Sequence, residues 1–158
     1  IDAFLHPDNS SLAGIYQVWH SKVAIGSGGI FGKGLFEGTQ KELKYLPVQK
    51  SDFIFSVIAE ELGLIGGAIV ILLYTVFLYR MLKIADNAKD RYGSLIVIGI
   101  LSMFAFQIFE NIAMAMGIMP VTGITLPFIS YGGSSVVSNM IALGIVLNVG
   151  IRSKIINF

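Results

Sequence analysis

The stretch SDFIFSVIAEELGLIGGAIVILLYTVFLY, residues 51–79, decides the class of fold. Its second part, from Leu62 to Tyr79, is a run of 18 residues without a charged side chain. A helix needs about 20 such residues to cross the hydrocarbon core of a bilayer. With the apolar residues from Phe53 to Ala59 added, the helix is long enough to cross with some tilt. We therefore predict a membrane helix over about residues 53–79.

The composition of the whole chain agrees with a membrane protein. Hydrophobic residues make up 54% and charged residues 13% of the 158 residues, with a mean hydropathy of +0.76, whereas soluble domains carry about a quarter charged residues. The net charge is +1 and there is no basic stripe, so nothing indicates a nucleic-acid partner. The chain has no cysteine, which excludes a disulfide framework and thiolate metal sites. It begins with Ile1 and shows no signal-peptide pattern, so we interpret it as part of a longer protein.

Two further apolar runs predict two more membrane helices, over about residues 94–119 and 136–150. The segment between them, PVTGITLPFISYGGSS at residues 120–135, is rich in proline, glycine and serine and is predicted to be an irregular loop. The predicted fold is an all-α polytopic membrane protein. Its three transmembrane helices lie within residues 53–158 and follow a large loop over residues 1–52.

Lysine and arginine residues indicate which side of the membrane each connection faces. Cytoplasmic loops carry an excess of these residues. The turn between the first two predicted spans and the C-terminal tail are both basic, through Arg80, Lys83, Lys89 and Arg91 in the turn and Arg152 and Lys154 in the tail. The turn and the tail are therefore predicted to be cytoplasmic, and residues 1–52 and 120–135 extracytoplasmic.

Residues 10–25 of the outer loop have the spacing of an amphipathic helix. Apolar side chains recur there at helical intervals, at Leu12, Ile15, Tyr16, Trp19 and Val23. Such a helix can lie in the membrane interface. The alternative is that it packs on the rest of the outer loop, and both interpretations keep it on the outer side.

The glycine-rich segment IGSGGIFGKG, residues 25–34, resembles a phosphate-binding loop but lacks its spacing. Ser27 stands where the first glycine of that motif is required, and Gly34 follows Lys33 where the motif needs serine or threonine. We predict a flexible, tightly turning outer loop. The alternative is that its backbone N–H groups, with Lys22 or Lys33, meet an anionic group.

Ala59, Gly63 and Gly67 form a series of small residues at intervals of four. Such a series allows a second membrane helix to approach closely. We interpret it as a structural packing stripe.

Four acidic residues near or within the predicted spans need an explanation, because carboxylates are costly in a membrane. Asp52 lies at the start of the first helix. It either caps that helix or stabilises the helix dipole, or it is a general base at the membrane surface. Glu60 and Glu61 either make structural hydrogen bonds or line a polar cavity for protons, cations or a charged substrate. Glu110 falls in the middle of the second predicted span, where a functional site and helix-to-helix hydrogen bonding are equally reasonable. These residues leave two classes open, a transporter-like protein and a membrane enzyme acting at the outer surface.

Three long motifs resemble the SEDS family (shape, elongation, division and sporulation) of RodA, FtsW and SpoVE. They are YQVWHSKVAIGSGGIFGKGLFEGTQKELKYLP, SDFIFSVIAEELGLIG and GIMPVTGITLPFISYGGSS, and together they run over nearly the whole chain. Through SKVAIGSGGIFGKG and EGTQ the resemblance is nearer to the RodA branch than to the FtsW branch. Members of this family have about ten membrane helices, so the chain would correspond to the large outer loop and the last three helices, and on its own it is expected to be inactive.

The resemblance implies a peptidoglycan glycosyltransferase in the bacterial plasma membrane. Its substrate would be lipid II, a disaccharide-pentapeptide on undecaprenyl pyrophosphate, polymerised on the extracytoplasmic face. The essential aspartate of the family's TDFIF-type motif matches Asp52, which would be the general base of an inverting transfer. Further candidates for the substrate cavity are Lys22, Glu60, Glu61, Glu110, Pro127, Ser130, Tyr131, Gly132 and Gly133.

The resemblance also implies a partner, which is usually a class B penicillin-binding protein, a transpeptidase. The departing pyrophosphate needs positive charge. A divalent cation (Mg²⁺ or Mn²⁺), Lys22, or a cation held with acidic residues could supply it. Val48 and Lys50 replace a glutamate and a histidine common in the family's LPE-x-HTDF pattern, which weakens any cation site built from those two side chains. Two alternative functions are a lipid II translocator and a non-catalytic scaffold for the transpeptidase.

Overall fold

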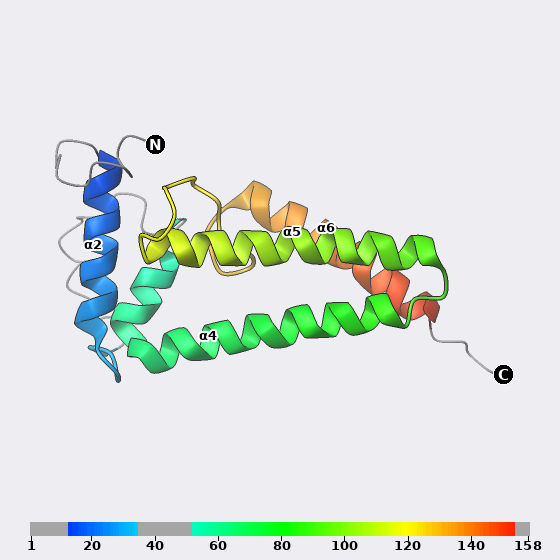
Figure 1. Cartoon of the computed structure of the whole chain (residues 1–158), viewed down its shortest axis with the longest axis horizontal. Coiled ribbons are helices and arrows are strands. Elements are labelled where there is room, and N and C mark those ends of the chain that lie inside the picture. The colour runs from blue at the N-terminus through cyan, green and yellow to red at the C-terminus, as the bar shows by residue number, and fades with distance from the viewer. Residues whose placement is uncertain (1–12, 35–51, 154–158) are drawn as a thin grey trace.

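The computed structural model describes residues 13–34 and 52–153, and these ranges form four helices. They are α2 (Ala13–Gly28), α4 (Ile54–Asp86), α5 (Arg91–Ala115) and α6 (Gly133–Ser153). In Figure 1, α4, α5 and α6 run along the length of the molecule, and α2 stands across one end of them. Most of the predicted outer loop over residues 1–52 lies outside the described residues.

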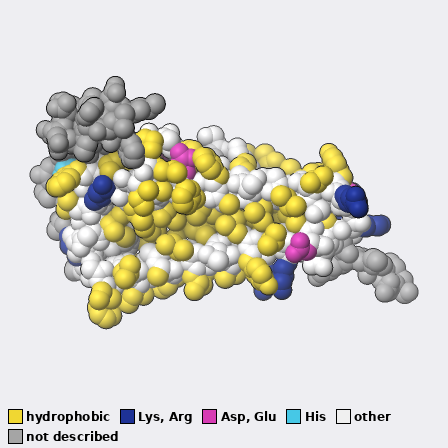
Figure 2. Space-filling view, in the orientation of Figure 1, with side chains coloured by type: hydrophobic (Ala, Val, Ile, Leu, Met, Phe, Trp, Pro, Cys, Tyr) yellow, Lys and Arg dark blue, Asp and Glu magenta, His cyan; other side chains and the backbone are white. Residues whose placement is uncertain are grey.

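Within the described residues, three helices are long and apolar enough to cross a membrane: Ile54–Asp86, Arg91–Ala115 and Gly133–Arg152. Their outward surfaces are apolar, as the yellow side chains along the helices in Figure 2 show. Large apolar patches of this kind are rare on soluble monomers. The chain is therefore an all-α, multi-pass membrane protein, which confirms the predicted class of fold.

The ends of the helices differ from the predicted ends for local reasons. Helix α4 continues past Tyr79 to Asp86, so part of the basic turn is helical. Helix α5 begins at Arg91, because the side chain of Asp90 accepts a hydrogen bond from the backbone N–H of Gly93 at 3.3 Å and caps the helix. It ends at Ala115, and Gly117 follows with a φ of 69°. The division of the chain into an outer loop and a membrane part remains a prediction.

A buried apolar cluster holds the three long helices together. Phe104 of α5 is fully buried and packs edge-on against Phe77 of α4, with ring centroids 5.5 Å apart. Val146 of α6 joins the same cluster, as does Leu126 of the connection between α5 and α6. The hydroxyl of Tyr74 donates to the backbone carbonyl of Pro127 at 2.6 Å, which ties that connection to α4. The connection therefore folds back onto the bundle.

Helix α4 is broken at Gly63, where φ is 68° and ψ is −164°. Residues 54–62 run beside α2 across the end of the bundle, and the rest of α4 turns to follow the bundle axis (Figure 1). The 23 residues after the break make a helix about 34 Å long, which is sufficient to span a membrane alone. The prediction that Phe53–Ala59 lengthens this span was wrong, because the positive φ of Gly63 redirects the chain.

The glycine-rich segment 29–34 supplies the hydrogen bonds that the break removes from α4. The backbone N–H groups of Leu64 and Ile65 donate to the carbonyls of Gly29 and Ile30, at 2.9 and 3.3 Å. In return, the backbone N–H groups of Lys33 and Gly34 donate to the carbonyls of Glu60 and Glu61, both at 3.1 Å. Buried backbone groups need such partners, above all next to lipid. The break is therefore a paired element of the fold.

Glycine is required where these two segments cross. A Cβ atom on Gly32 would collide with the carbonyl oxygen of Glu61, and one on Gly63 would collide with the backbone of Gly32 and Ile30. Both glycines also have positive φ. The segment turns tightly, as predicted, but it packs on α4, which contradicts the expected flexible loop. Ala59 belongs to the same contact, because its carbonyl lies where a Cβ on Gly28 would be.

Helix α2 packs on α4 and α5 through its small residues. Ser21, Ala24 and Gly28 are buried, and the Ser21 hydroxyl donates to the carbonyl of Ala115 at 2.6 Å. Trp19 on the other side is 65% exposed. The helix thus packs on the described bundle and also stands crosswise to the three spans. Its position at the membrane interface remains a prediction.

We expect Gly63→Ala to destabilise the protein for two reasons. The new methyl group would collide with the backbone of Gly32, and the positive φ of residue 63 is strained for alanine. The expected loss in free energy of unfolding is at least about 2 kcal/mol, measured as a lower thermal midpoint in detergent. Gly99→Ala is the matched control, because Gly99 lies in a helix and a Cβ atom there would have no other atom within 4 Å. Equal midpoints for the two variants would contradict the requirement at Gly63.

Candidate functional site

Asp52 lies directly before α4, at the end of the bundle that carries α2. The cap residue of α4 is Phe53, and no side chain makes a capping hydrogen bond there. The capping interpretation of Asp52 is therefore wrong. Its carboxylate is half-buried and makes no hydrogen bond to the residues that the structure describes. It remains next to the positive end of the helix dipole, which is a favourable place for a carboxylate.

Asn111 of α5 holds the backbone at Asp52. Its side-chain Nδ2 donates to the carbonyl of Asp52 at 3.0 Å and to the carbonyl of Ile124 at 2.7 Å. The side chain is fully buried. One amide therefore joins the start of α4, the end of α5 and the connection that follows α5. Asn111 was not among the site residues predicted from sequence, where its only signal was a polar residue beside Glu110 within an apolar run.

The connection between α5 and α6 passes the carboxylate of Asp52 at Gly123. A Cβ atom on Gly123 would lie 3.7 Å from Asp52 Oδ2, and Gly123 has a φ of 75°. A side chain at this position would be strained and would fill the space next to the carboxylate. The glycine therefore keeps the approach to Asp52 open.

Lys22 of α2 lies against the start of this connection. Its side chain is exposed and crosses Gly117, where a Cβ would collide with the lysine Cε. Gly117 opens the connection that reaches Asp52 at Gly123. Lys22 thus adds a positive charge at the same end of the bundle as Asp52.

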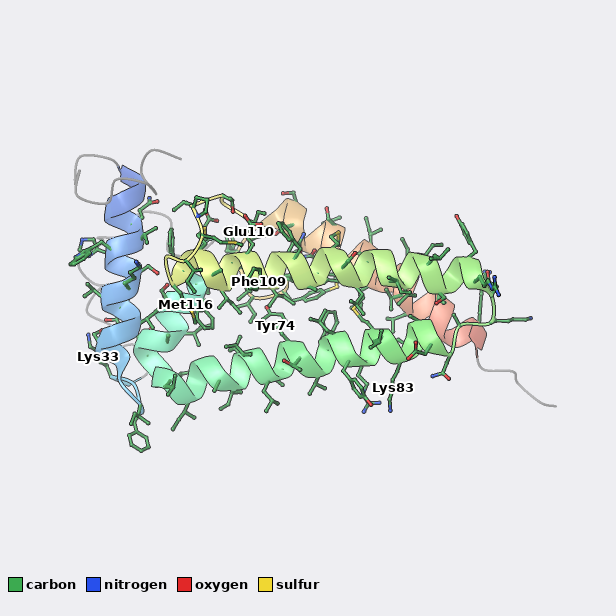
Figure 3. The ribbon with its side chains drawn as sticks, viewed as in Figure 1. Lys33, Tyr74, Lys83, Phe109, Glu110 and Met116 are labelled. Carbon is green, nitrogen blue, oxygen red and sulfur yellow. The ribbon has the colours of Figure 1, made fainter. Side chains whose placement is uncertain are left out.

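Glu60 and Glu61 lie at the break in α4 and not within the spanning part. Glu60 is 1% exposed and pairs with Lys33, whose Nζ lies 3.0 Å from Glu60 Oε1. Figure 3 shows Lys33 at the bend of α4, with Lys83 near the other end of the same helix. The ion pair reinforces the backbone bonds between these segments. The structure thus gives Glu60 a structural partner, and a role in a substrate cavity remains a prediction for both glutamates.

Glu110 lies closer to the end of α5 than predicted. Helix α5 ends at Ala115, five residues later, so Glu110 is about 8 Å from that end and not in the middle of the span. Its side chain is 6% exposed, and Oε2 has no hydrogen-bond partner among the described residues. The same is true of Gln107 Oε1 and Asn111 Oδ1 on this face of the helix. These three oxygens can accept a hydrogen bond or ligate a cation.

The predicted cavity residues between Pro127 and Gly133 mostly shape the connection itself. The Ser130 hydroxyl accepts a hydrogen bond from the backbone N–H of Leu126 at 2.8 Å. The Gly132 carbonyl accepts one from the Ser135 hydroxyl at 2.9 Å at the start of α6. Tyr131 is 80% exposed. No described contact joins these residues to Asp52, and their part in a cavity remains a prediction.

Acidic and histidine side chains do not assemble into a metal site within the described ranges. No group of three or more His, Cys, Asp or Glu residues comes together there. The carboxylate of Asp52 is of the hard oxygen type that Mg²⁺ and Mn²⁺ prefer. A divalent cation near Asp52 would need most of its ligands from other groups, such as water and substrate phosphates.

Comparison with known proteins gives the family. The family model for FtsW, RodA and SpoVE, described as "Cell cycle protein", matches residues 1–155. The chain belongs to this family. It is 47% identical over 154 residues to stage V sporulation protein E of Bacillus subtilis, covering 98% of the chain and 42% of that protein. It is 46% identical over 149 residues to peptidoglycan glycosyltransferase RodA of Treponema pallidum, covering 94% and 34%.

A solved structure shares the same fold. It is described as "Structural coordination of polymerization and crosslinking by a peptidoglycan synthase complex", with a TM-score of 0.78 and 32% identity, covering 96% of this chain and 40% of that one. The chain thus spans about two fifths of that chain, and 34–42% of the length of the two relatives above. The family resemblance expected from the SDFIF and SYGGSS motifs is confirmed.

In this SEDS-family chain, we expect Asn111→Leu to lower stability, because it leaves the carbonyls of Asp52 and Ile124 without their donor. Each lost partner costs about 1–3 kcal/mol when the acceptor stays buried. The thermal midpoint of the full-length protein measures the loss. Asn87→Leu is the control, since Asn87 is exposed at the other end and its side chain makes one bond to the Lys83 carbonyl. A midpoint unchanged by Asn111→Leu would contradict the role given to this amide.

Proposed function

We propose that the protein is a peptidoglycan glycosyltransferase that polymerises lipid II, with Asp52 as its general base. The observation that supports this most directly is the position of Asp52. Its carboxylate caps no helix, its backbone is held by Asn111, and Gly123 leaves room beside it. Relatives named peptidoglycan glycosyltransferase support the reaction class.

The proposed reaction is a single displacement with inversion at the donor sugar. The 4-hydroxyl of the acceptor N-acetylglucosamine attacks the anomeric carbon of the donor, and Asp52 accepts the hydroxyl proton. The bond from the anomeric carbon to the pyrophosphate oxygen breaks, and undecaprenyl pyrophosphate leaves with the electron pair. Positive charge stabilises that leaving group. Lys22, near the connection that passes Asp52, is the described side chain suited to this role, and a divalent cation would supply further charge.

The membrane orientation fits this proposal. The bundle end opposite Asp52 carries the exposed basic residues Arg80, Lys83, Lys89, Arg91 and Arg152. An excess of such residues favours the cytoplasmic side, which puts Asp52 on the extracytoplasmic face, where lipid II is polymerised. The structurally similar peptidoglycan synthase complex supports a transpeptidase of the penicillin-binding class as partner.

The structure weakens the main argument for a lipid II translocator. That alternative rested on carboxylates inside the membrane spans. Glu60 pairs with Lys33 at the break of α4, and Glu110 lies near the end of α5. These acidic residues gather at the Asp52 end of the bundle, so they do not mark a path across the membrane. A scaffold without catalysis has no specific observation in its favour.

Asp52→Asn tests the proposal in the full-length protein with labelled lipid II. We expect glycan polymerisation to fall by about 10²–10⁴-fold, because the asparagine amide cannot accept the proton. The asparagine side chain has nearly the same size as aspartate, so the packing is unchanged. Asp86→Asn is the matched control, since Asp86 is exposed at the far end of α4 and should leave the rate unaltered. Polymerisation at the parental rate by Asp52→Asn would rule out Asp52 as the base.

A further inference from the structure

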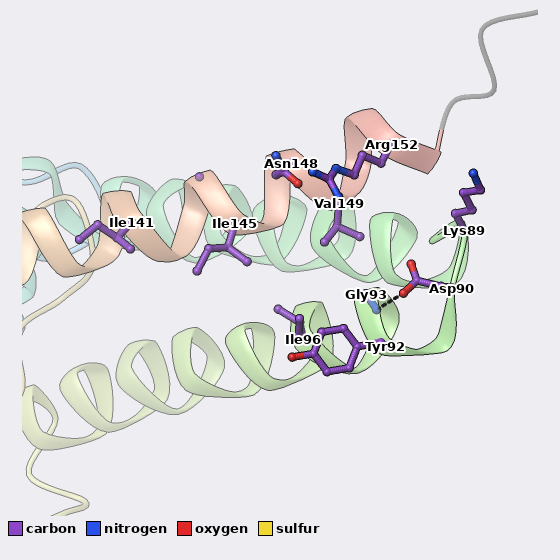
Figure 4. Close-up of a pocket in the computed structure, with 11 residues that line it drawn as sticks. Lys89, Asp90, Tyr92, Gly93, Ile96, Ile141, Ile145, Asn148, Val149 and Arg152 are labelled. Atoms are coloured by element: carbon purple, nitrogen blue, oxygen red, sulfur yellow. Dashed lines mark hydrogen bonds between the residues drawn. The ribbon is translucent and has the colours of Figure 1, made fainter.

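A groove opens between α5 and α6 at the end of the bundle far from Asp52. Its volume is about 450 Å³, within the range of pockets that hold small ligands. Figure 4 shows residues of both helices and of the turn before α5 facing it. It belongs neither to the proposed catalytic site nor to the break in α4.

The inner wall of this groove is apolar. Ile141, Ile145 and Val149 of α6 face Ile96 of α5 across it. Gly144 also lines the groove, and a Cβ there would have no atom within 4 Å, so this part of the wall is open. From Ile141 to Val149 this wall follows α6 for about 12 Å, with the polar Asn148 also lining the groove. An apolar surface of this length suits part of an acyl chain.

The mouth of the groove is polar and carries two cations. Lys89 and Arg152 are exposed, and neither forms an ion pair within the described part of the chain. Asp90 is also at the mouth, where one of its oxygens caps α5 through the N–H of Gly93 at 3.3 Å. The net charge of Lys89, Arg152 and Asp90 at the mouth is therefore positive. Tyr92 is 74% exposed beside them, a position typical of tyrosine at the membrane surface.

We propose that this groove binds an anionic phospholipid, with its phosphate at Lys89 and Arg152 and one acyl chain between α5 and α6. The arrangement matches an amphiphile, because the cations lie at the end of a membrane span and the apolar wall runs along it. Basic pockets between membrane helices recognise anionic headgroups in this way. A soluble phosphate would use the mouth but not the apolar wall. The inference rests on the membrane-spanning helices and does not require the glycosyltransferase activity.

Native mass spectrometry of the full-length detergent-solubilised protein tests the charge at the mouth. Phosphatidylglycerol and phosphatidylcholine with identical acyl chains are titrated in parallel, and we expect phosphatidylglycerol to bind more tightly. The double variant Lys89→Ala/Arg152→Ala should lose roughly ten- to thirtyfold in phosphatidylglycerol affinity. Arg80→Ala/Lys83→Ala is the matched control, because it removes the same charge at the same end outside the groove. Equal losses in both double variants would overturn the proposal.

Gly144→Leu tests the apolar wall without changing any charge. The new side chain fills open space in the groove and should weaken phosphatidylglycerol binding, while Gly99→Leu on α5, also in open space and outside the groove, should not. Thermal midpoints equal to the parent's show that both variants are folded. Parental binding by Gly144→Leu, displacement of the lipid by inorganic phosphate, or no preference of the parent for phosphatidylglycerol would each overturn the proposal.

Discussion

The exchange of four backbone hydrogen bonds at the break of α4 is the constraint on which the rest of the structure depends. A helix that bends at Gly63 leaves N–H and carbonyl groups without partners, which is costly beside lipid. Residues 29–34 supply those partners, and Lys33 adds an ion pair to Glu60. Because this exchange fixes the bend, residues 54–62 lie beside α2 and Asp52 comes to the end of the bundle.

The two ends of the bundle consequently differ in chemistry. One end gathers the carboxylates of Asp52, Glu60 and Glu110 with the amide of Asn111. Glu60, Glu110 and Asn111 are buried, and Asn111 holds the backbone carbonyl of Asp52. The other end exposes lysine and arginine side chains around a groove with an apolar wall. A half-buried carboxylate suits the proposed proton transfer at one surface, whereas exposed cations above an apolar groove suit the proposed contact with lipid at the other. The same three spans can therefore serve both surfaces.

Prediction from sequence succeeded where a single local property decides the outcome. The apolar runs predicted the three membrane helices because length and hydropathy alone determine whether a helix can span a bilayer. Prediction from sequence failed at Gly63. A glycine there fits either a continuous helix with a small-residue packing face or a break in the helix, and only the backbone of the distant segment 29–34 decides between the two. Sequence left the role of Glu60 open between a structural hydrogen bond and a cavity for the same reason, since its partner Lys33 is 27 residues away. Asn111 was missed because its acceptors, Asp52 and Ile124, meet only in the folded chain.

The sequence by itself determined that the chain is a helical membrane protein, that it resembles the SEDS family, and that Asp52 is the carboxylate to test. These follow from hydropathy and from motifs that are continuous along the chain. Only the tertiary structure decided the direction of residues 54–62, the absence of a cap role for Asp52, and the end of the bundle to which each carboxylate belongs. The physical reason is that each of these depends on hydrogen bonds and close contacts between segments far apart in sequence, and no local pattern records which distant backbone will satisfy a given group.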